Sequence, residues 1–140
     1  MNDQALSPPS GASRLLVQTR ISSRDDWGDT HILLEPGARY FFRAHGKWWD
    51  ALIHCDANGY DRWYTNFAKD RLRCRKDGAI WFTLIGAIEE STDSLFVIGD
   101  GARLRDGWIA PTGGRLTAFA NDMHGMYWNN TSSITLEVWR

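Results

Sequence analysis

The feature that most constrains the fold is a series of short apolar, strand-like runs separated by glycine and proline turns, of which residues 116–120 and 134–139 alternate with period two. Such runs occupy residues 15–21, 38–44, 79–85, 94–98, 116–120 and 134–139. Alternation places every second side chain on one face of a strand, and no segment shows a helical period of useful length. Turns such as Glu35-Pro36-Gly37 join the runs. The sequence therefore predicts an all-β domain, an antiparallel β-sandwich of the jelly-roll kind.

The length of 140 residues suits one domain, which we place at residues 14–140 after a flexible N-terminal tail at residues 1–13. The tail contains the run Ser7-Pro8-Pro9-Ser10-Gly11. The chain has 16 basic and 17 acidic residues, a formal net charge of −1, so it has no overall field to attract nucleic acid. A local basic cluster at residues 69–76 is predicted to be the outer face of a strand or hairpin.

Cysteine content and hydropathy set expectations about the compartment. Two cysteines, Cys55 and Cys74, form neither a disulfide framework nor a zinc-binding pattern. No apolar run has the length needed to span a bilayer, and the N-terminus shows no secretory signal. A cytoplasmic location with reduced thiols is the default expectation, and signal-independent export stays open.

One late stretch, residues 121–131, concentrates oxygen-bearing side chains between two predicted strands. It contains Asp122, Asn129 and Asn130 around a central glycine, Gly125. Hard cations such as Ca²⁺ take six to eight oxygens from carboxylates, amides, backbone carbonyls and water. Asn, Asp and Gly are also common in ordinary turns, so the residues alone leave an ordinary turn and a calcium loop both open.

Eight tryptophans are unusual for a chain of this size. Five of them lie near glycines or other turn residues, where an indole would be partly exposed: Trp48, Trp49, Trp63, Trp108 and Trp128. Exposed aromatic rings stack on the apolar faces of sugars, and the indole N–H donates to hydroxyls. The alternative is that these side chains fill a thick sandwich core. We expect a mixture of the two.

These elements together resemble the galactophilic bacterial lectin family of the PA-IL type and related galactose-binding-like β-sandwiches. The resemblance covers roughly residues 15–140 and is most specific at residues 121–130, which match an ND…G-x-Y-x-N-N loop. Further matches are the turn at residues 35–37, the A-x-G-x-W element at residues 44–48 and the strand at residues 78–86. The resemblance implies a lectin whose late loop holds one calcium ion, with sugar hydroxyls completing the shell of the ion.

Carried over by position, the resemblance implies a metal-ligand set and a set of sugar contacts. The metal ligands would be the Asp122 carboxylate, the Met126 carbonyl, the Asn129 and Asn130 side chains, and a backbone carbonyl near Asp50. The sugar contacts would be Asp122, Met123, His124 and Asn129. The stretch at residues 46–70, which is dense in aromatic and polar residues, adds Trp48, Tyr60 and Trp63 as candidate contacts on its own composition, since residues 51–75 lie outside the resemblance. The family's own sugar-contacting loop has no recognisable counterpart between residues 51 and 63. The resemblance also suggests a dimer or tetramer, so a homo-oligomer is expected on that basis.

Three functions follow for testing. The first is a calcium-dependent, non-catalytic carbohydrate-binding protein for galactose-type or related glycans, without a nucleic-acid partner and without membrane insertion. The second is a glycosidase, with its acid and base drawn from Asp50, Asp56, Asp61, Glu89, Glu90, Asp93 and Asp122. The third is a β-sandwich structural or interaction module that has lost the ion. We favour the first, because no nucleophile motif or metal-ligand spacing of histidines is present.

Overall fold

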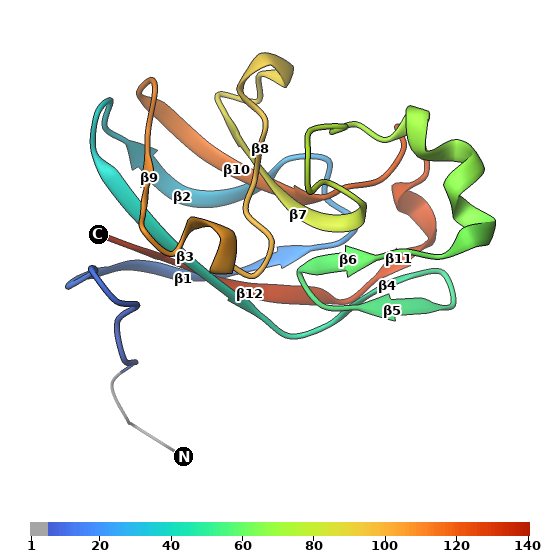
Figure 1. The fold of residues 1–140 in the computed structure, drawn as a ribbon, viewed down its shortest axis with the longest axis horizontal. Coiled ribbons are helices and arrows are strands. Elements are labelled where there is room, and N and C mark those ends of the chain that lie inside the picture. The colour runs from blue at the N-terminus through green and yellow to red at the C-terminus, as the bar shows by residue number, and fades with distance from the viewer. Residues whose placement is uncertain (1–5) are drawn as a thin grey trace.

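Two antiparallel β-sheets pack face to face in the computed structural model, which describes residues 6–140 (Figure 1). One sheet has the strand order β1 (Leu15–Ser22), β12 (Ser133–Trp139), β3 (Arg39–His45) and β9 (Trp108–Ile109). The other has the order β2 (Gly28–Leu34), β10 (Gly114–Ala120), β7 (Trp81–Ile88) and β6 (Asn58–Tyr60), with β8 (Phe96–Val97) also paired to β7. The predicted all-β sandwich is confirmed.

A third, smaller sheet forms at one end of the sandwich. Its strand order is β11 (Asn130–Thr131), β4 (Trp48–Asp50) and β5 (Ile53–Cys55). Within residues 6–140, helical structure is limited to four 3₁₀ segments: η1 (Trp63–Arg71), η2 (Thr92–Ser94), η3 (Ala102–Leu104) and η4 (Tyr127–Asn129). Segment η1 lies at the same end of the molecule as β4, β5 and β11 (Figure 1). This end of the sandwich therefore carries the irregular structure.

The core follows from the alternation seen in the sequence. Leu136 and Val138 of β12 lie opposite Ala44 and Phe42 of β3, and all four are buried between the sheets. Strand β7 is buried along its whole length because its outer face is also covered. On that outer face, Phe119 forms a second buried cluster with Cys74, Ile85, Ala87 and Leu95. Complete burial of a side chain such as Phe119 contributes about 1.5–3 kcal/mol.

The N-terminal segment contacts the body of the domain within its described part. The backbone N–H groups of Ser13 and Arg14 both donate to the carbonyl of Arg140, at 2.8 and 2.9 Å. Gly11 lies against the ring of Phe41, where an added Cβ would be 3.1 Å from the ring. Residues 1–5 of the predicted tail lie outside the described residues.

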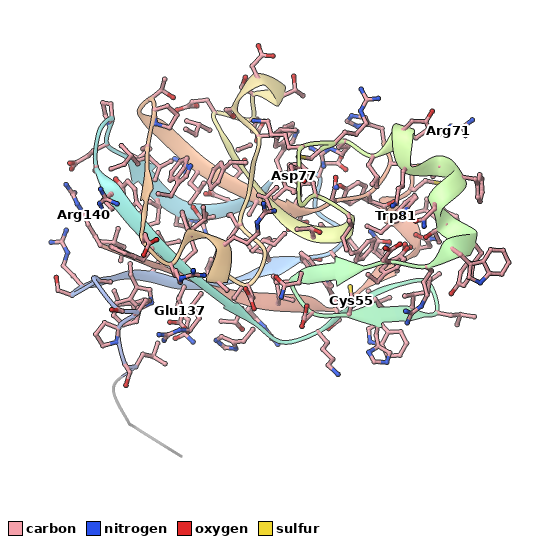
Figure 2. All side chains as sticks on the ribbon, in the orientation of Figure 1. Cys55, Arg71, Asp77, Trp81, Glu137 and Arg140 are labelled. Carbon is pink, nitrogen blue, oxygen red and sulfur yellow. The ribbon has the colours of Figure 1, made fainter. Side chains whose placement is uncertain are left out.

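The prediction for the basic cluster is wrong. Lys69 and Arg71 fall at the end of η1, and only an isolated bridge at Leu72 follows. Figure 2 shows Arg71 at the end of the molecule opposite Arg140. The segment does not alternate apolar and polar residues, and of the η1 residues only Ala68 is buried. It therefore lies over the sandwich without joining a sheet.

Candidate functional site

The third sheet brings two distant parts of the chain together. Strands β4 and β11 pair so that Asp50 lies opposite Asn130 and Trp49 lies opposite Thr131. Just beyond β4, Ala51 has a φ of 50°, and its backbone N–H donates to the carbonyl of Asn129 at 3.2 Å. A positive φ is unfavourable for a residue with a Cβ, so the pairing holds this turn in a strained conformation. The β4 end is thereby fixed against the late loop.

Buried hydrogen bonds fix the late loop, residues 121–131, at its start. The Asn121 side chain is fully buried; it accepts from the Cys74 N–H at 3.0 Å. Its amide nitrogen donates to the carbonyls of Cys74 and Ile80, at 2.9 and 3.0 Å. Gly125, at φ 80°, allows the tight turn in which the Met126 N–H donates to the Met123 carbonyl. The loop is therefore folded back on a rigid base.

Asp122 is the buried carboxylate of this loop, with only 2% of its surface exposed. One oxygen, Oδ1, accepts from the Met123 N–H at 2.7 Å; the other, Oδ2, accepts from the Asn130 amide at 3.1 Å. Burial raises the pKa of Asp122 to about 6, although these two hydrogen bonds act to lower it. A buried carboxylate with a raised pKa is costly when ionised, and a nearby cation would relieve that cost.

Two amide oxygens beside Asp122 are buried and have no hydrogen-bond partner. They are Oδ1 of Asn129 and Oδ1 of Asn130. Asn130 is fully buried, and its amide nitrogen donates both to the Ser23 carbonyl at 2.8 Å and to Asp122. Since those bonds use the nitrogen, the oxygen is left over. Five other buried side-chain atoms of the described residues also lack a partner, but Oδ1 of Asn130 belongs to the amide that bonds to Asp122, and a hard cation would satisfy an oxygen in that position.

A second acidic side chain lies close to this group. Asp50 Oδ2 accepts a hydrogen bond from the Tyr60 hydroxyl at 2.5 Å. Burial raises the pKa of Asp50, and the charge of Asp50 in turn contributes to the raised pKa of Asp122. Burial and the Asp50 carboxylate also raise the pKa of Tyr60. The two carboxylates therefore interact electrostatically, as carboxylates around one divalent cation do.

Arg73 supports the loop from beneath. Its guanidinium carbon lies 3.5 Å from the ring centroid of Phe119 and 4.6 Å from that of Trp27. It donates to the Tyr127 hydroxyl at 2.8 Å, and that hydroxyl donates to the Ala120 carbonyl. The Arg73 N–H donates to the Asp122 carbonyl at 3.1 Å. Arg73 thus joins the outer face of β10 to the start and the middle of the loop, at Asp122 and Tyr127; the sequence carries no signal of this role.

The structure brings two of the predicted metal ligands, Asp122 and Asn130, into direct contact, with Asn129 next to Asn130 in the chain, and strand pairing places Asp50 opposite Asn130. The carbonyl of Met126 lies in the same loop, immediately before η4. Described residues 6–140 contain no cluster of three or more His, Cys, Asp or Glu side chains that could hold a metal. The candidate site is instead built from carboxylate, amide and carbonyl oxygens, a ligand set that suits Ca²⁺ and not zinc.

The structure buries two of the predicted sugar contacts. Trp48 was expected at the surface but is completely buried, with its ring edge-on to Phe82 at 5.9 Å. Strand alternation turns Trp48 inward and its neighbour Trp49 outward. Tyr60 is likewise buried, stacked on Trp81 at 6.3 Å, so its ring cannot serve as a sugar platform.

Three predicted contacts remain near the surface, namely Met123, His124 and Trp63. Trp128, beside Asn129, was also predicted to be partly exposed and is 68% exposed. Phe67 in η1, which is 86% exposed, was not predicted. The repeated aromatic residues of the η1 segment were a visible signal, but their outward direction was not.

The carboxylates proposed for catalysis are mostly solvent-exposed. Asp56, Asp61, Glu89, Glu90 and Asp93 all lie at the surface, and only Asp50 and Asp122 are shielded near one another. Cys55 and Cys74 are free and buried, and burial is the main cause that raises the pKa of Cys55 to about 12. Within residues 6–140 no helix is both long and apolar enough to cross a membrane.

Comparison with known proteins agrees with the fold. No protein-family model matches the sequence, and no curated protein matches it significantly. Among solved structures, the EclA N-terminal domain, described as a PllA-like lectin, aligns over 91% of this chain and 98% of its own length. The TM-score is 0.63 and the sequence identity is 17%. At this identity the likeness shows the fold alone, and the chain has the β-sandwich fold of a PllA-like lectin.

Proposed function

We propose that this protein is a non-catalytic, calcium-dependent carbohydrate-binding protein. The observation that carries the proposal is the pair of buried, unpartnered oxygens on Asn129 and Asn130 beside the buried Asp122 carboxylate. Two amide oxygens without a partner among the described residues, next to a carboxylate whose oxygens accept one hydrogen bond each, would form the core of a site for a hard cation. The fold of a PllA-like lectin supports the same assignment.

The residues that would hold the ion are the side chains of Asp122, Asn129 and Asn130, with backbone carbonyls of Met126 and Asp50. Calcium prefers six to eight oxygens, so five protein ligands leave positions for outside oxygens. A bound calcium ion supplies a fixed attraction for two neighbouring hydroxyls of a sugar. The protein residues hold that position rigidly through the anchors at Asn121 and Arg73.

A metal is needed because neutral sugars are weak ligands for protein alone. Each hydrogen bond to a hydroxyl competes with water and gains only about 1 kcal/mol. Hydroxyls that ligate a divalent cation gain more, and only suitably arranged hydroxyls can reach the ion. The resemblance of residues 121–130 to the loop of galactophilic lectins favours galactosides or related glycans as the ligand.

A panel of immobilised glycans tests the proposal. Binding should appear with millimolar CaCl₂, disappear with excess EDTA and return when calcium is restored. Asp122→Asn should abolish the calcium-dependent signal, whereas Asp93→Asn, a change at an exposed carboxylate in η2, should not alter it. Glycan binding that is unchanged in EDTA would remove the metal from the account. Turnover of glycosides by the wild-type protein would contradict the non-catalytic assignment.

A further inference from the structure

The segment that contains η1 is anchored at both ends beside the candidate site. Before η1, the Tyr60 hydroxyl bonds to Asp50. After η1, Leu72 forms an isolated β-bridge with Met123, and the Arg73 N–H donates to the Asp122 carbonyl. Both anchors involve residues of the candidate site or their immediate neighbours. The η1 segment therefore lies along the rim of the site.

Segment η1 presents aromatic rings to solvent. In a 3₁₀ helix the side chains at i and i+3 lie on the same face, so Tyr64 and Phe67 share one face. Trp63 is 85% exposed, and its ring packs edge-on against Tyr64 at 5.6 Å. Large apolar side chains grouped in this way on a surface usually mark an interaction site. Their flat faces suit the apolar face of a sugar.

The same segment is basic. Residues 61–75 contain five basic and two acidic side chains, a formal charge of +3 in a chain whose net charge is −1. The exposed side chains of Lys69 and Arg75 line one hollow with Leu72 and Ile80, and Asp70 is the one carboxylate in that lining. Within residues 6–140, neither Lys69 nor Arg75 has a carboxylate within ion-pair distance.

We propose that this hollow, between Lys69 and Arg75, binds the negatively charged group of an acidic oligosaccharide whose neighbouring sugar sits at the candidate metal site. The inference rests on the proposed function. Leu72 connects the two places, because it lines the hollow and also pairs with Met123 at the edge of the site. One ligand can therefore span both, with its apolar faces against the aromatic side chains of η1.

Charge balance favours an anionic ligand over a neutral one. A divalent cation would neutralise the Asp50 and Asp122 carboxylates, and the basic excess of residues 61–75 would then remain. An anion placed there gains charge-assisted hydrogen bonds, and arginine can hold a carboxylate or a sulfate through two parallel bonds. Sialic or uronic acids and sulfated sugars all offer this chemistry.

The test uses paired glycans that share a neutral core, lactose, and differ only in a 6′-linked sialic acid or a 6′-sulfate. Binding is measured with calcium and with EDTA, in low and high NaCl, for the full chain and two variants. Lys69→Gln combined with Arg75→Gln removes the two charges, and Arg20→Gln removes an exposed charge on β1 as a control. Thermal melting of each variant confirms folding. Anionic phospholipid vesicles and single-stranded DNA complete the panel.

We expect the acidic partners to bind about fivefold more tightly than lactose in calcium and low salt, because each new ion pair is solvent-exposed. High salt and the double variant should both remove that preference while lactose binding stays the same, and the Arg20→Gln variant should retain it. The tighter of the sialylated and sulfated partners then identifies the anion.

Equal affinity for acidic and neutral partners would overturn the inference and leave the proposed function intact. So would an acidic preference that survives in the double variant. Equal binding of vesicles or DNA in EDTA would assign the basic surface to lipid or nucleic acid instead. The absence of calcium-dependent binding to any glycan, the lactose set included, would overturn the proposed function and this inference with it.

Discussion

Replacing Asp122 with asparagine should separate the cost of burying this carboxylate from its use in holding a metal. Burial raises the pKa of Asp122 from 3.8 to about 6. Each pKa unit corresponds to about 1.4 kcal/mol, so the ionised carboxylate destabilises the metal-free fold by up to roughly 3 kcal/mol at neutral pH. Asparagine is nearly isosteric and carries no charge, but its NH2 group cannot accept the hydrogen bond that Asp122 Oδ2 takes from Asn130, which costs about 1–3 kcal/mol at every pH. The metal-free variant should therefore gain stability relative to the wild type only as the carboxylate ionises.

The pH dependence has a definite sign. The raised pKa means that the folded chain retains a proton that the unfolded chain has lost. The cost is absent below about pH 4 and complete above about pH 6. In EDTA, the stability of Asp122→Asn relative to the wild type should consequently grow as the pH rises from 4 to 6 and then level off. Urea unfolding of both proteins across this range measures the difference.

Calcium should change the relative stability of the two proteins in the opposite direction, in favour of the wild type. At a concentration one hundred times its dissociation constant, a ligand that binds only the folded state stabilises it by about 2.7 kcal/mol. The wild type should gain this stabilisation and Asp122→Asn should not. A stability difference between the two proteins in EDTA that does not change from pH 4 to pH 7, or a variant that keeps the full calcium shift, would refute the reasoning.

Three further predictions follow from the contacts and the burial of individual residues. Asn129→Ala should remove the calcium shift with little change in metal-free stability, whereas Asn130→Ala should also cost about 1–3 kcal/mol, since its amide makes two buried hydrogen bonds; equal costs in calorimetry would contradict this. Arg73→Lys should destabilise by about 2 kcal/mol and weaken calcium binding, because lysine cannot both stack and donate to the same partners; an unchanged melting temperature would refute it. Cys55, whose pKa is raised to about 12, should react with a thiol reagent only after unfolding; rapid labelling of the native protein would show that the thiol is accessible.

The sequence predicted the strands because alternation survives wherever one face of a strand is buried. Strands β1, β3, β10 and β12 all lie within one or two residues of the predicted runs. The grouping of Asp122, Asn129 and Asn130 in one loop was also predictable, because the three residues are local in sequence; their role as metal ligands stays a prediction. Asp50 was placed only through the resemblance, since its pairing with Asn130 spans 80 residues and no local pattern encodes it.

The errors of the sequence-based predictions concern the directions in which side chains point, because these directions depend on packing. Trp48 and Trp49 are adjacent and chemically identical, and only the pairing of β4 with β5 and β11 decides that the first turns inward. The η1 segment has no period that would have shown its exposed rings. The contacts of Arg73 join three separate parts of the chain, so they could not have been inferred from any one of them.

The most direct test of the central claim is a crystal structure determined in millimolar calcium. The account predicts one ion bound by oxygens of Asp122, Asn129 and Asn130 and by the carbonyls of Met126 and Asp50, at about 2.3–2.6 Å. A water molecule in that position, with hydrogen-bond distances to the same oxygens, would contradict the claim that this loop holds a metal.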